Sequence, residues 1–376
     1  MHVNIDGYAR NHLQSVAPAI QISVRHKGNE IVRSSSGKSA PDEADTEIND
    51  ETQFDIASVT KLFTASVFML LVQRGMVSLD DRLSTRCPNV VLQLYGSVEH
   101  KNAPHKSGKP LAQQIGFEDI SFRHLLLHTS GLEPSVTLDH LSDKQAVVDK
   151  QAVVAAIGRT SLNTNPGYKY IYSDLGFILL GQAISEITGK SLEKIINELI
   201  IKPLKLKKTE FCPRYSTDSY DLFAATEWCR KRGRRVIGEV HDEKAWLMGG
   251  VAGHAGLFSN ATDLSLFGTT FIHGETFMGA ISKKMTQPCH VGECAYRGLG
   301  FAFYHNLDNV EPDTMSAYSF GHTGFTGTSL WIDPSRDLVV ACLTNRVYYG
   351  RENMAIAGFR REIHRHIISL VDAEKF

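Results

Sequence analysis

The period of the apolar residues changes twice along this chain of 376 residues, which limits the folds that it can form. Residues 20–25 alternate apolar and polar side chains, Lys27-Gly28-Asn29 is typical of a turn, and Ile31-Val32 begins a return strand. This pattern predicts a β-hairpin near the N-terminus. The middle of the chain has helical spacing instead, most clearly in three segments: 61–74, 175–187 and 191–201.

Strand-like segments return near the C-terminus at 299–304, 316–320, 328–332 and 338–343, before a closing helix at about 352–370. Strands at both ends with helices between them predict an α/β (α+β) class, in which both termini contribute to one antiparallel sheet. We expect a single domain over residues 1–376, with a sheet lobe from about 1–57 and 290–376 and a helical lobe from about 58–289.

Composition excludes several classes of function. The 40 Lys and Arg residues nearly balance the 41 Asp and Glu residues, so no net field points to nucleic acid or an anionic membrane. The longest apolar stretch, 62–72, is too short to span a bilayer, and residues 1–6 lack the features of a secretory signal. The 6 cysteines show no framework spacing and are expected to be reduced. These features predict a cytoplasmic protein, although a trimmed periplasmic or extracellular protein would share them.

The tetrapeptide Ser58-Val59-Thr60-Lys61 stands at the start of a helical segment. A lysine three residues after a serine lies on the same helix face, where its amine can reach the serine hydroxyl. The helix N-terminus adds unpaired N–H groups and positive partial charge, which stabilise an oxyanion. Taken alone, however, the tetrapeptide is better explained as an N-cap serine followed by a solvated lysine, because both residues are common.

Three further stretches change that interpretation: 165–176, which holds Tyr172 and Asp174 just before a buried helix, 321–327 between two strand patterns, and 125–132. With them, the sequence resembles the penicillin-recognising serine hydrolases over nearly its whole length. It is most similar to the branch with class C β-lactamases, penicillin-binding-protein-like peptidases and related esterases. The resemblance implies a β-lactamase/transpeptidase-like fold, with an antiparallel sheet flanked by helices and a mainly helical lobe.

The resemblance also implies roles for individual residues. Ser58 matches the acylated nucleophile, Lys61 the lysine that shares its proton, and Tyr172 the base toward the serine and acid toward the leaving group. The backbone N–H groups of Ser58 and Phe325 match the oxyanion hole. The positions that match substrate-binding residues are Asp174, His322, Thr323 and Gly324.

Two positions depart from the pattern of the family. His322 stands where relatives commonly have lysine, which places a group with an ordinary pKa of about 6.5 where a permanent cation is usual. We therefore expect weak β-lactam binding, and either pH-dependent binding of a substrate carboxylate or a purely architectural hydrogen bond to Tyr172 or the strand backbone. Asp174 stands where asparagine is usual. A carboxylate there favours the ammonium form of Lys61 and leaves Tyr172 as the dominant base.

The segments 238–243 and 249–259 resemble a subgroup associated with cell-wall fragment metabolism. The resemblance thus implies a serine hydrolase that forms an acyl-enzyme on Ser58 and cleaves an amide or ester of a peptidoglycan-derived or β-lactam-like substrate. Two alternatives stay open: an acyltransferase or carboxylesterase on the same fold, and a penicillin-sensor-like binding domain. The sequence indicates no cofactor and no oligomeric state.

Several other segments have simpler explanations. His241, Asp242 and His254 match no zinc-site spacing and are expected to pin loops by hydrogen bonds rather than bind metal. His128 is expected to have a structural role in a helix-end loop. The polar segment 94–116 is predicted to be a mobile loop that borders the substrate cleft, and the basic run 230–235 a solvated surface.

Overall fold

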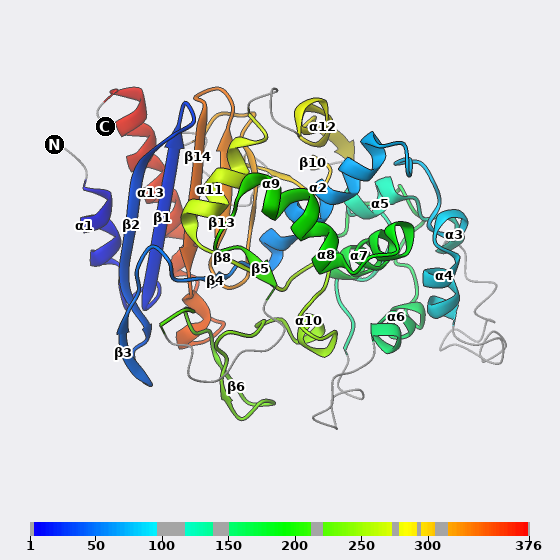
Figure 1. The fold of residues 1–376 in the computed structure, drawn as a ribbon, viewed down its shortest axis with the longest axis horizontal. Helices are drawn as coiled ribbons and strands as arrows, with labels where there is room; N and C mark the ends of the chain where they lie inside the picture. Colours follow the sequence, from blue (N-terminus) through cyan, green and yellow to red (C-terminus); the bar gives the residue numbers. More distant parts are fainter. Residues whose placement is uncertain are drawn as a thin grey trace.

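The computed structural model describes residues 4–95, 117–137, 150–211, 221–272, 278–291, 295–304 and 315–374. Its largest element is a nine-stranded sheet in the order β3-β2-β1-β14-β13-β12-β11-β10-β9, in which every neighbouring pair is antiparallel (Figure 1). The first three strands of the chain are β1 (Ala19–His26), β2 (Asn29–Ala40) and β3 (Ala44–Glu47). The others are β9 (Cys289–Val291), β10 (Ala295–Arg297), β11 (Ala302–Phe303), β12 (Phe320–Thr323), β13 (Ser329–Asp333) and β14 (Leu338–Thr344).

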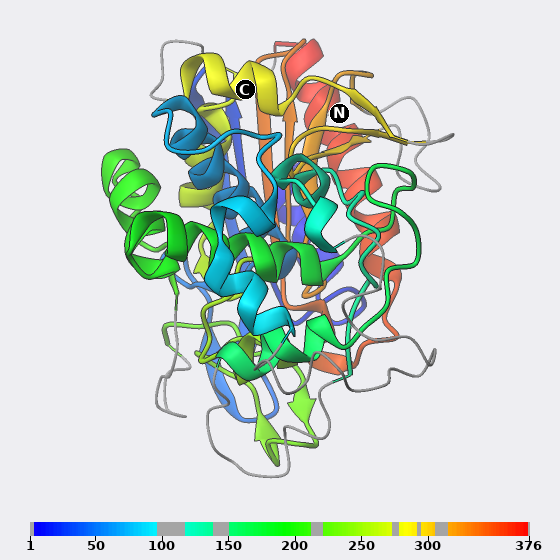
Figure 2. The same cartoon turned by 90° about the vertical axis from the view of Figure 1, so that its right-hand side faces the viewer.

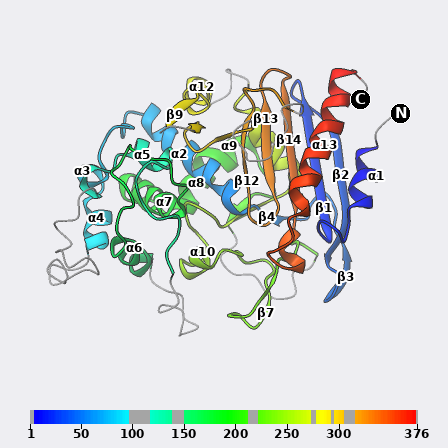
Figure 3. The ribbon, with the colours of Figure 1, turned by 180° about the vertical axis from the view of Figure 1, so that it is seen from behind.

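The two ends of the chain meet where β1 pairs with β14, from Ile20 opposite Thr344 to His26 opposite Leu338. All of β14 and nearly all of β1 is buried, because helices cover both faces of the sheet. On one face lie α1 (Ile5–Asn11) and α13 (Ala355–Asp372), as Figure 3 shows from behind. On the other lies α11 (Ala261–Thr269), which contacts β1, β13 and β14. This arrangement confirms the predicted fold class.

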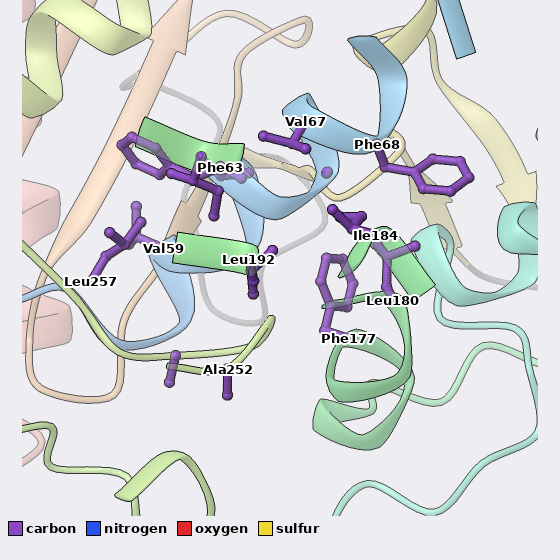
Figure 4. Close-up of a cluster of buried hydrophobic side chains, with 14 of the residues drawn as sticks. Val59, Phe63, Val67, Phe68, Phe177, Leu180, Ile184, Leu192, Ala252 and Leu257 are labelled. Carbon is purple, nitrogen blue, oxygen red and sulfur yellow. The ribbon is translucent and has the colours of Figure 1, made fainter. Parts of the chain in front are cut away.

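The helical part of the molecule surrounds α2 (Thr60–Gln73), whose residues 60–71 are all buried. A helix that is apolar on all sides needs neighbours on all sides. Its neighbours include α7 (Asp174–Thr188), α8 (Leu192–Ile196) and α12 (Gly279–Met285). Figure 4 shows side chains of α2 and α7 in one apolar cluster, and Figure 2 views the molecule from the helical side with the sheet behind. Around this centre lie α3 (Leu83–Arg86), α4 (Pro88–Tyr95), α5 (Phe122–Leu126) and α6 (Lys150–Gly158).

Short elements complete the described chain. A three-stranded sheet joins β4 (Phe54–Asp55), β8 (Leu257–Ser259) and β5 (Glu210–Phe211), and a hairpin joins β6 (Trp228–Cys229) to β7 (Arg234–Arg235). The remaining helical segments are η1 (Ala57–Val59), η4 (Phe117–Asp119), η6 (Asn197–Ile201), α9 (Lys202–Leu204), α10 (Glu243–Leu247) and η8 (Arg346–Tyr349). None of the helices described is both long enough and apolar enough to cross a bilayer.

Some predicted boundaries were wrong. Residues 316–319 form a turn rather than a strand, because Asp333 accepts hydrogen bonds from the N–H and the hydroxyl of Ser316 at 3.0 and 2.6 Å. The strand begins only at Phe320. The predicted strand at 299–304 shrinks to Ala302–Phe303. Residues 94 and 95 end α4, and the rest of the predicted loop 94–116 lies outside the described residues. Cys87, Cys229, Cys289 and Cys342 are free thiols.

Candidate active site

Ser58 lies in a backbone turn that a buried carboxylate holds in shape. Ala57, just before it, has a φ of 45°, in the left-handed region that costs a residue with a Cβ about 1–3 kcal/mol. Asp55 supports this turn: its Oδ1 accepts the Ala57 N–H at 2.8 Å and its Oδ2 accepts the His241 N–H at 2.7 Å. Burial raises the pKa of Asp55. Sequence reasoning missed Asp55, although it comes only three residues before the nucleophile.

Lys61 occupies the first turn of α2, and its buried Nζ contacts several polar groups. It lies 3.0 Å from Ser58 Oγ, 2.9 Å from Asp174 Oδ1 and 3.4 Å from the carbonyl oxygen of His254. Its distance to the centroid of the Tyr172 ring is 4.9 Å. Burial by itself lowers the pKa of Lys61, but the negative charge of Asp174 and the Tyr172 side chain outweigh it, so the pKa lies above its ordinary value.

Asp174 is the first residue of α7, which Ser173 caps through a hydrogen bond from the Gly176 N–H to its hydroxyl. Burial by itself raises the pKa of Asp174. The nearby Lys61 and His254 lower it by more than burial raises it, so the pKa of Asp174 lies below its ordinary value. Asp174 is thus a carboxylate and Lys61 an ammonium ion. This is the charge state that the sequence predicted for an aspartate at position 174.

His128 supports the residues before α7. Its Nδ1 accepts the Ser173 N–H at 3.1 Å, and its ring centroid lies 4.5 Å from that of Tyr172. Burial, and then the charge of Lys61, lowers the pKa of His128 well below its ordinary value, so the ring is neutral. These contacts fit the structural role predicted for His128.

The segment 321–328 brings the end of β12 against the residues before Ser58. The Thr326 hydroxyl donates to the Asp55 carbonyl oxygen at 2.7 Å, and the Thr328 hydroxyl donates to the Ile56 carbonyl oxygen at 3.1 Å. A Cβ on Gly324 would lie 2.2 Å from Thr328 Oγ1 and 2.6 Å from the Ile56 oxygen, so this approach requires glycine.

The same contacts fix the positions of Ser58 and Phe325 relative to each other. Among the hydrogen bonds of the described residues, neither the Ser58 N–H nor the Phe325 N–H is donated to a protein acceptor. Two free N–H groups on segments that are hydrogen-bonded together can serve as an oxyanion hole.

His322 is buried on β12 and differs from what the sequence predicted. Its Nδ1–H donates to the neighbouring Thr323 carbonyl oxygen at 2.7 Å. Burial, followed by the charge of Lys61, lowers its pKa to about 3. The expectation of a group that titrates near neutrality was therefore wrong, because the sequence did not show that this strand end is covered. The geometry favours the architectural alternative.

A pocket of about 280 Å³ opens beside the nucleophile. Four of the predicted residues line it: Ser58, Tyr172, Asp174 and Phe325. Among the charged residues of its wall, Glu243, Lys244 and Arg351 were not predicted from the sequence to belong to the site. His241 and Asp242, which also line the pocket, were expected only to pin loops. His322, Thr323 and Gly324 do not belong to its wall. The pocket is thus lined by several charged groups together with Phe325.

Asp174, Asp242 and His254 offer side-chain atoms that lie within 4.8 Å of one another. Such a set can bind a divalent cation, but here the carboxylates already have cationic or N–H partners. Lys61 forms an ion pair with Asp174, and Lys244 forms ion pairs with both Asp174 and Asp242. His254 Nε2 lies 2.8 Å from Asp242 Oδ1. A metal ion would have to displace two ammonium groups, so the set fits an ion-pair network better than a metal centre.

A serine, a lysine and a tyrosine gathered beside two free N–H groups define a serine hydrolase of the acyl-enzyme type. A model of the beta-lactamase family matches residues 5–365, so this chain belongs to that family.

Individual relatives and solved structures agree with this assignment. A putative D-alanyl-D-alanine carboxypeptidase of Salmonella enteritidis PT4 is 28% identical over 371 residues, which cover 91% of this chain and 82% of that protein. Among solved structures, EstCE1, a hydrolase with promiscuous acyltransferase activity, superposes with a TM-score of 0.73 at 19% identity, covering 96% of this chain and 97% of EstCE1. A class C beta-lactamase superposes with a TM-score of 0.71 at 16% identity, covering 97% and 94%. The two structures show the same fold.

Proposed function

We propose that this protein hydrolyses an amide of a small peptidoglycan-derived substrate through an acyl-enzyme on Ser58. The observation that carries the proposal is the contact of Ser58 Oγ with the buried Lys61, which the Asp174 carboxylate keeps in its ammonium form. The relatives named as putative carboxypeptidases support the choice of substrate, since such enzymes cleave a peptide bond next to a terminal D-alanine.

The charges of the site assign the first proton transfer. Lys61 is an ammonium ion and donates to Ser58 Oγ, so it cannot accept the proton of that hydroxyl. We assign the role of base to the hydroxyl oxygen of Tyr172, whose ring lies beside the Lys61 ammonium. Ser58 Oγ then bonds to the acyl carbon, and the carbonyl oxygen becomes an oxyanion held by the Ser58 and Phe325 N–H groups.

The second half of the reaction reverses these roles. Tyr172 returns the proton to the leaving amine as the tetrahedral intermediate collapses to the acyl-enzyme. A water molecule then attacks the acyl carbon with Tyr172 as base, and the proton that Tyr172 removes is passed to Ser58 Oγ as the acid is released. Ser58 and Tyr172 are thereby returned to their starting states for the next turnover.

A second candidate is a carboxylesterase or acyltransferase, and the state of His322 favours it. A buried, neutral imidazole supplies no cation at this position, where relatives commonly have lysine. Recognition at this position therefore does not require a carboxylate on the substrate. Simple esters would satisfy the remaining groups of the site, whereas β-lactams with a carboxylate would bind weakly.

Turnover on matched substrates tests the proposal. We expect the purified chain to release D-alanine from a peptide ending in D-alanyl-D-alanine and to hydrolyse p-nitrophenyl esters, with both activities lost in Ser58→Ala. Ester hydrolysis without any peptide cleavage would select the second candidate. Turnover of either substrate by Ser58→Ala at the wild-type rate would contradict both.

A further inference from the structure

Lys61 belongs to a closed ring of ionic contacts and hydrogen bonds that also includes four other side chains and one backbone carbonyl. Its Nζ lies 2.9 Å from Asp174 Oδ1, and Asp174 Oδ2 lies 3.4 Å from Lys244 Nζ. Lys244 Nζ lies 3.3 Å from Asp242 Oδ2, and Asp242 Oδ1 lies 2.8 Å from His254 Nε2. The His254 carbonyl oxygen, 3.4 Å from Lys61 Nζ, closes the ring. Neither the sequence pattern nor the proposed reaction assigns a role to Lys244.

The members of this ring come from separate elements that packing holds in place. Lys244 belongs to α10, whose N-cap is Asp242, with Asp242 Oδ1 accepting the Ala245 N–H at 2.8 Å. His254 follows Gly253, which packs so closely on α7 that a Cβ there would lie 2.0 Å from the Phe177 carbonyl oxygen. The positions of both carboxylates are thus set by α7 and α10, and Lys244 bridges the two helices.

Lys244 separates two like charges. Oxygen atoms of Asp174 and Asp242 lie within 4.8 Å of each other, and the charge of Asp242 opposes ionisation of Asp174. The Lys244 side chain is 13% exposed, so water screens this repulsion poorly, and Glu243 adds a third carboxylate to the same wall. Without the ammonium group, Asp174 would face Asp242 with no cation between them.

We infer that Lys244 is a positioning residue, which holds the Asp174 carboxylate on Lys61 by neutralising Asp242 beside it. This inference rests on the proposed function. Removal of the Lys244 charge leaves Asp174 to take up a proton or to turn away from Asp242. Either change alters the charge that Lys61 presents to Ser58 and Tyr172, and the reaction slows although Ser58, Lys61 and Tyr172 are all retained.

The test compares Lys244→Met with wild type in the pH dependence of kcat/KM for a p-nitrophenyl ester. We expect kcat/KM to fall about 10- to 100-fold near neutral pH, as for a modest misplacement of a reacting group. The acid limb should also move to higher pH, because Asp174 is more easily protonated once a neighbouring cation is lost. In Lys244→Arg the acid limb of the pH profile should stay at its wild-type pH. Lys190→Met, which removes a lysine from the surface ion pair with Glu198, is the matched control and should change neither quantity.

A double variant separates positioning from a general structural effect. If Lys244 acts through Asp174, adding Lys244→Met to Asp174→Asn should change kcat/KM and the acid limb little further. The inference would be overturned if the kcat/KM losses of the two single variants multiply in the double variant, or if Lys244→Met keeps the wild-type pH profile. Lys244→Gln, which keeps N–H donors without charge, replaces Lys244→Met if that variant does not fold. Wild-type turnover tests the proposed function separately, since an inactive wild type would contradict that function and not the ring of contacts.

Discussion

Lys61 keeps its charge in a buried position because its nearest neighbours compensate for the water that it has lost. The Asp174 carboxylate at 2.9 Å supplies an opposite charge, and the His254 carbonyl oxygen and Ser58 Oγ accept further hydrogen bonds. A buried lysine without such partners would shed its proton and become a base. The general base that we propose is therefore a different residue, Tyr172, whose ring centroid lies 4.9 Å from Lys61 Nζ.

The neutral state of His322 leads to a prediction about pH. Because its pKa is lowered to about 3, the ring takes up no proton on going from about pH 8 down to about pH 5, where an exposed histidine would become charged. Substrates with a carboxylate and matched neutral esters should therefore show parallel pH profiles of kcat/KM over this range. A KM that rises above about pH 6.5 only for the carboxylate-bearing substrate would show that His322 is protonated and contacts it.

Asp55 should matter for both stability and rate. In Asp55→Asn the amide can accept only one of the two N–H groups of Ala57 and His241, and its NH₂ group faces the other donor. We expect a loss of about 1–3 kcal/mol in the free energy of unfolding, together with a lower kcat, because the left-handed turn before Ser58 relaxes. Urea unfolding and ester hydrolysis measure these quantities. In Asp80→Asn, which alters an exposed ion pair with Arg123, both should stay near wild type, and equal behaviour of the two variants would contradict this role.

At the scale of elements, the end of β12 and the start of α2 act as one unit. Two threonine hydroxyls of the segment after β12 bond the carbonyl oxygens of Asp55 and Ile56. The N–H groups of Ser58 and Phe325 are thus set relative to each other before a substrate binds. In the proposed reaction these donors need no reorganisation as the oxyanion forms, which is the physical reason that donors fixed in advance contribute strongly to rate.

Gly324→Ala should disrupt this unit. The added methyl group would collide with Thr328 Oγ1 and with the Ile56 carbonyl oxygen, so the segment that carries the Phe325 N–H must move. We expect kcat to fall about 10²–10³-fold, as for the loss of one oxyanion donor. Gly358→Ala in α13, where a Cβ meets nothing within 4 Å, should keep full activity and gain up to about 1 kcal/mol of stability. Wild-type kcat in Gly324→Ala would show that the Phe325 N–H does not hold the oxyanion.

At the scale of the whole molecule, the sequence predicted the architecture better than the details of the site. The strands of the sheet centre are apolar runs, and α2 and α7 have strong helical patterns, so their type and order follow from local sequence. Residues 316–319 were misassigned because the aspartate that holds their turn, Asp333, is distant in sequence. The division into lobes and the cytoplasmic location stay predictions.

The candidate site was predicted only where residues share a motif. Ser58, Lys61, Tyr172 and Asp174 come together as expected, because each motif sits at the start of a helix. Lys244 and Asp55 were missed because charged residues of this kind usually lie on a solvated surface, and only tertiary packing buries them here. The burial of His322 has the same cause: β13 and the Tyr172 ring lie beside it in the folded chain, and no local sequence pattern indicates this.

The measurement that tests the central claim most directly is the trapping of the covalent intermediate. The protein is mixed with a p-nitrophenyl ester, quenched in acid within the first turnovers, digested and analysed by mass spectrometry. We predict one acyl group, located on the peptide that contains Ser58, with no adduct in Ser58→Ala and slower formation in Asp174→Asn. An acyl group on another residue, or hydrolysis at the wild-type rate by Ser58→Ala, would contradict the assignment of Ser58 as the nucleophile.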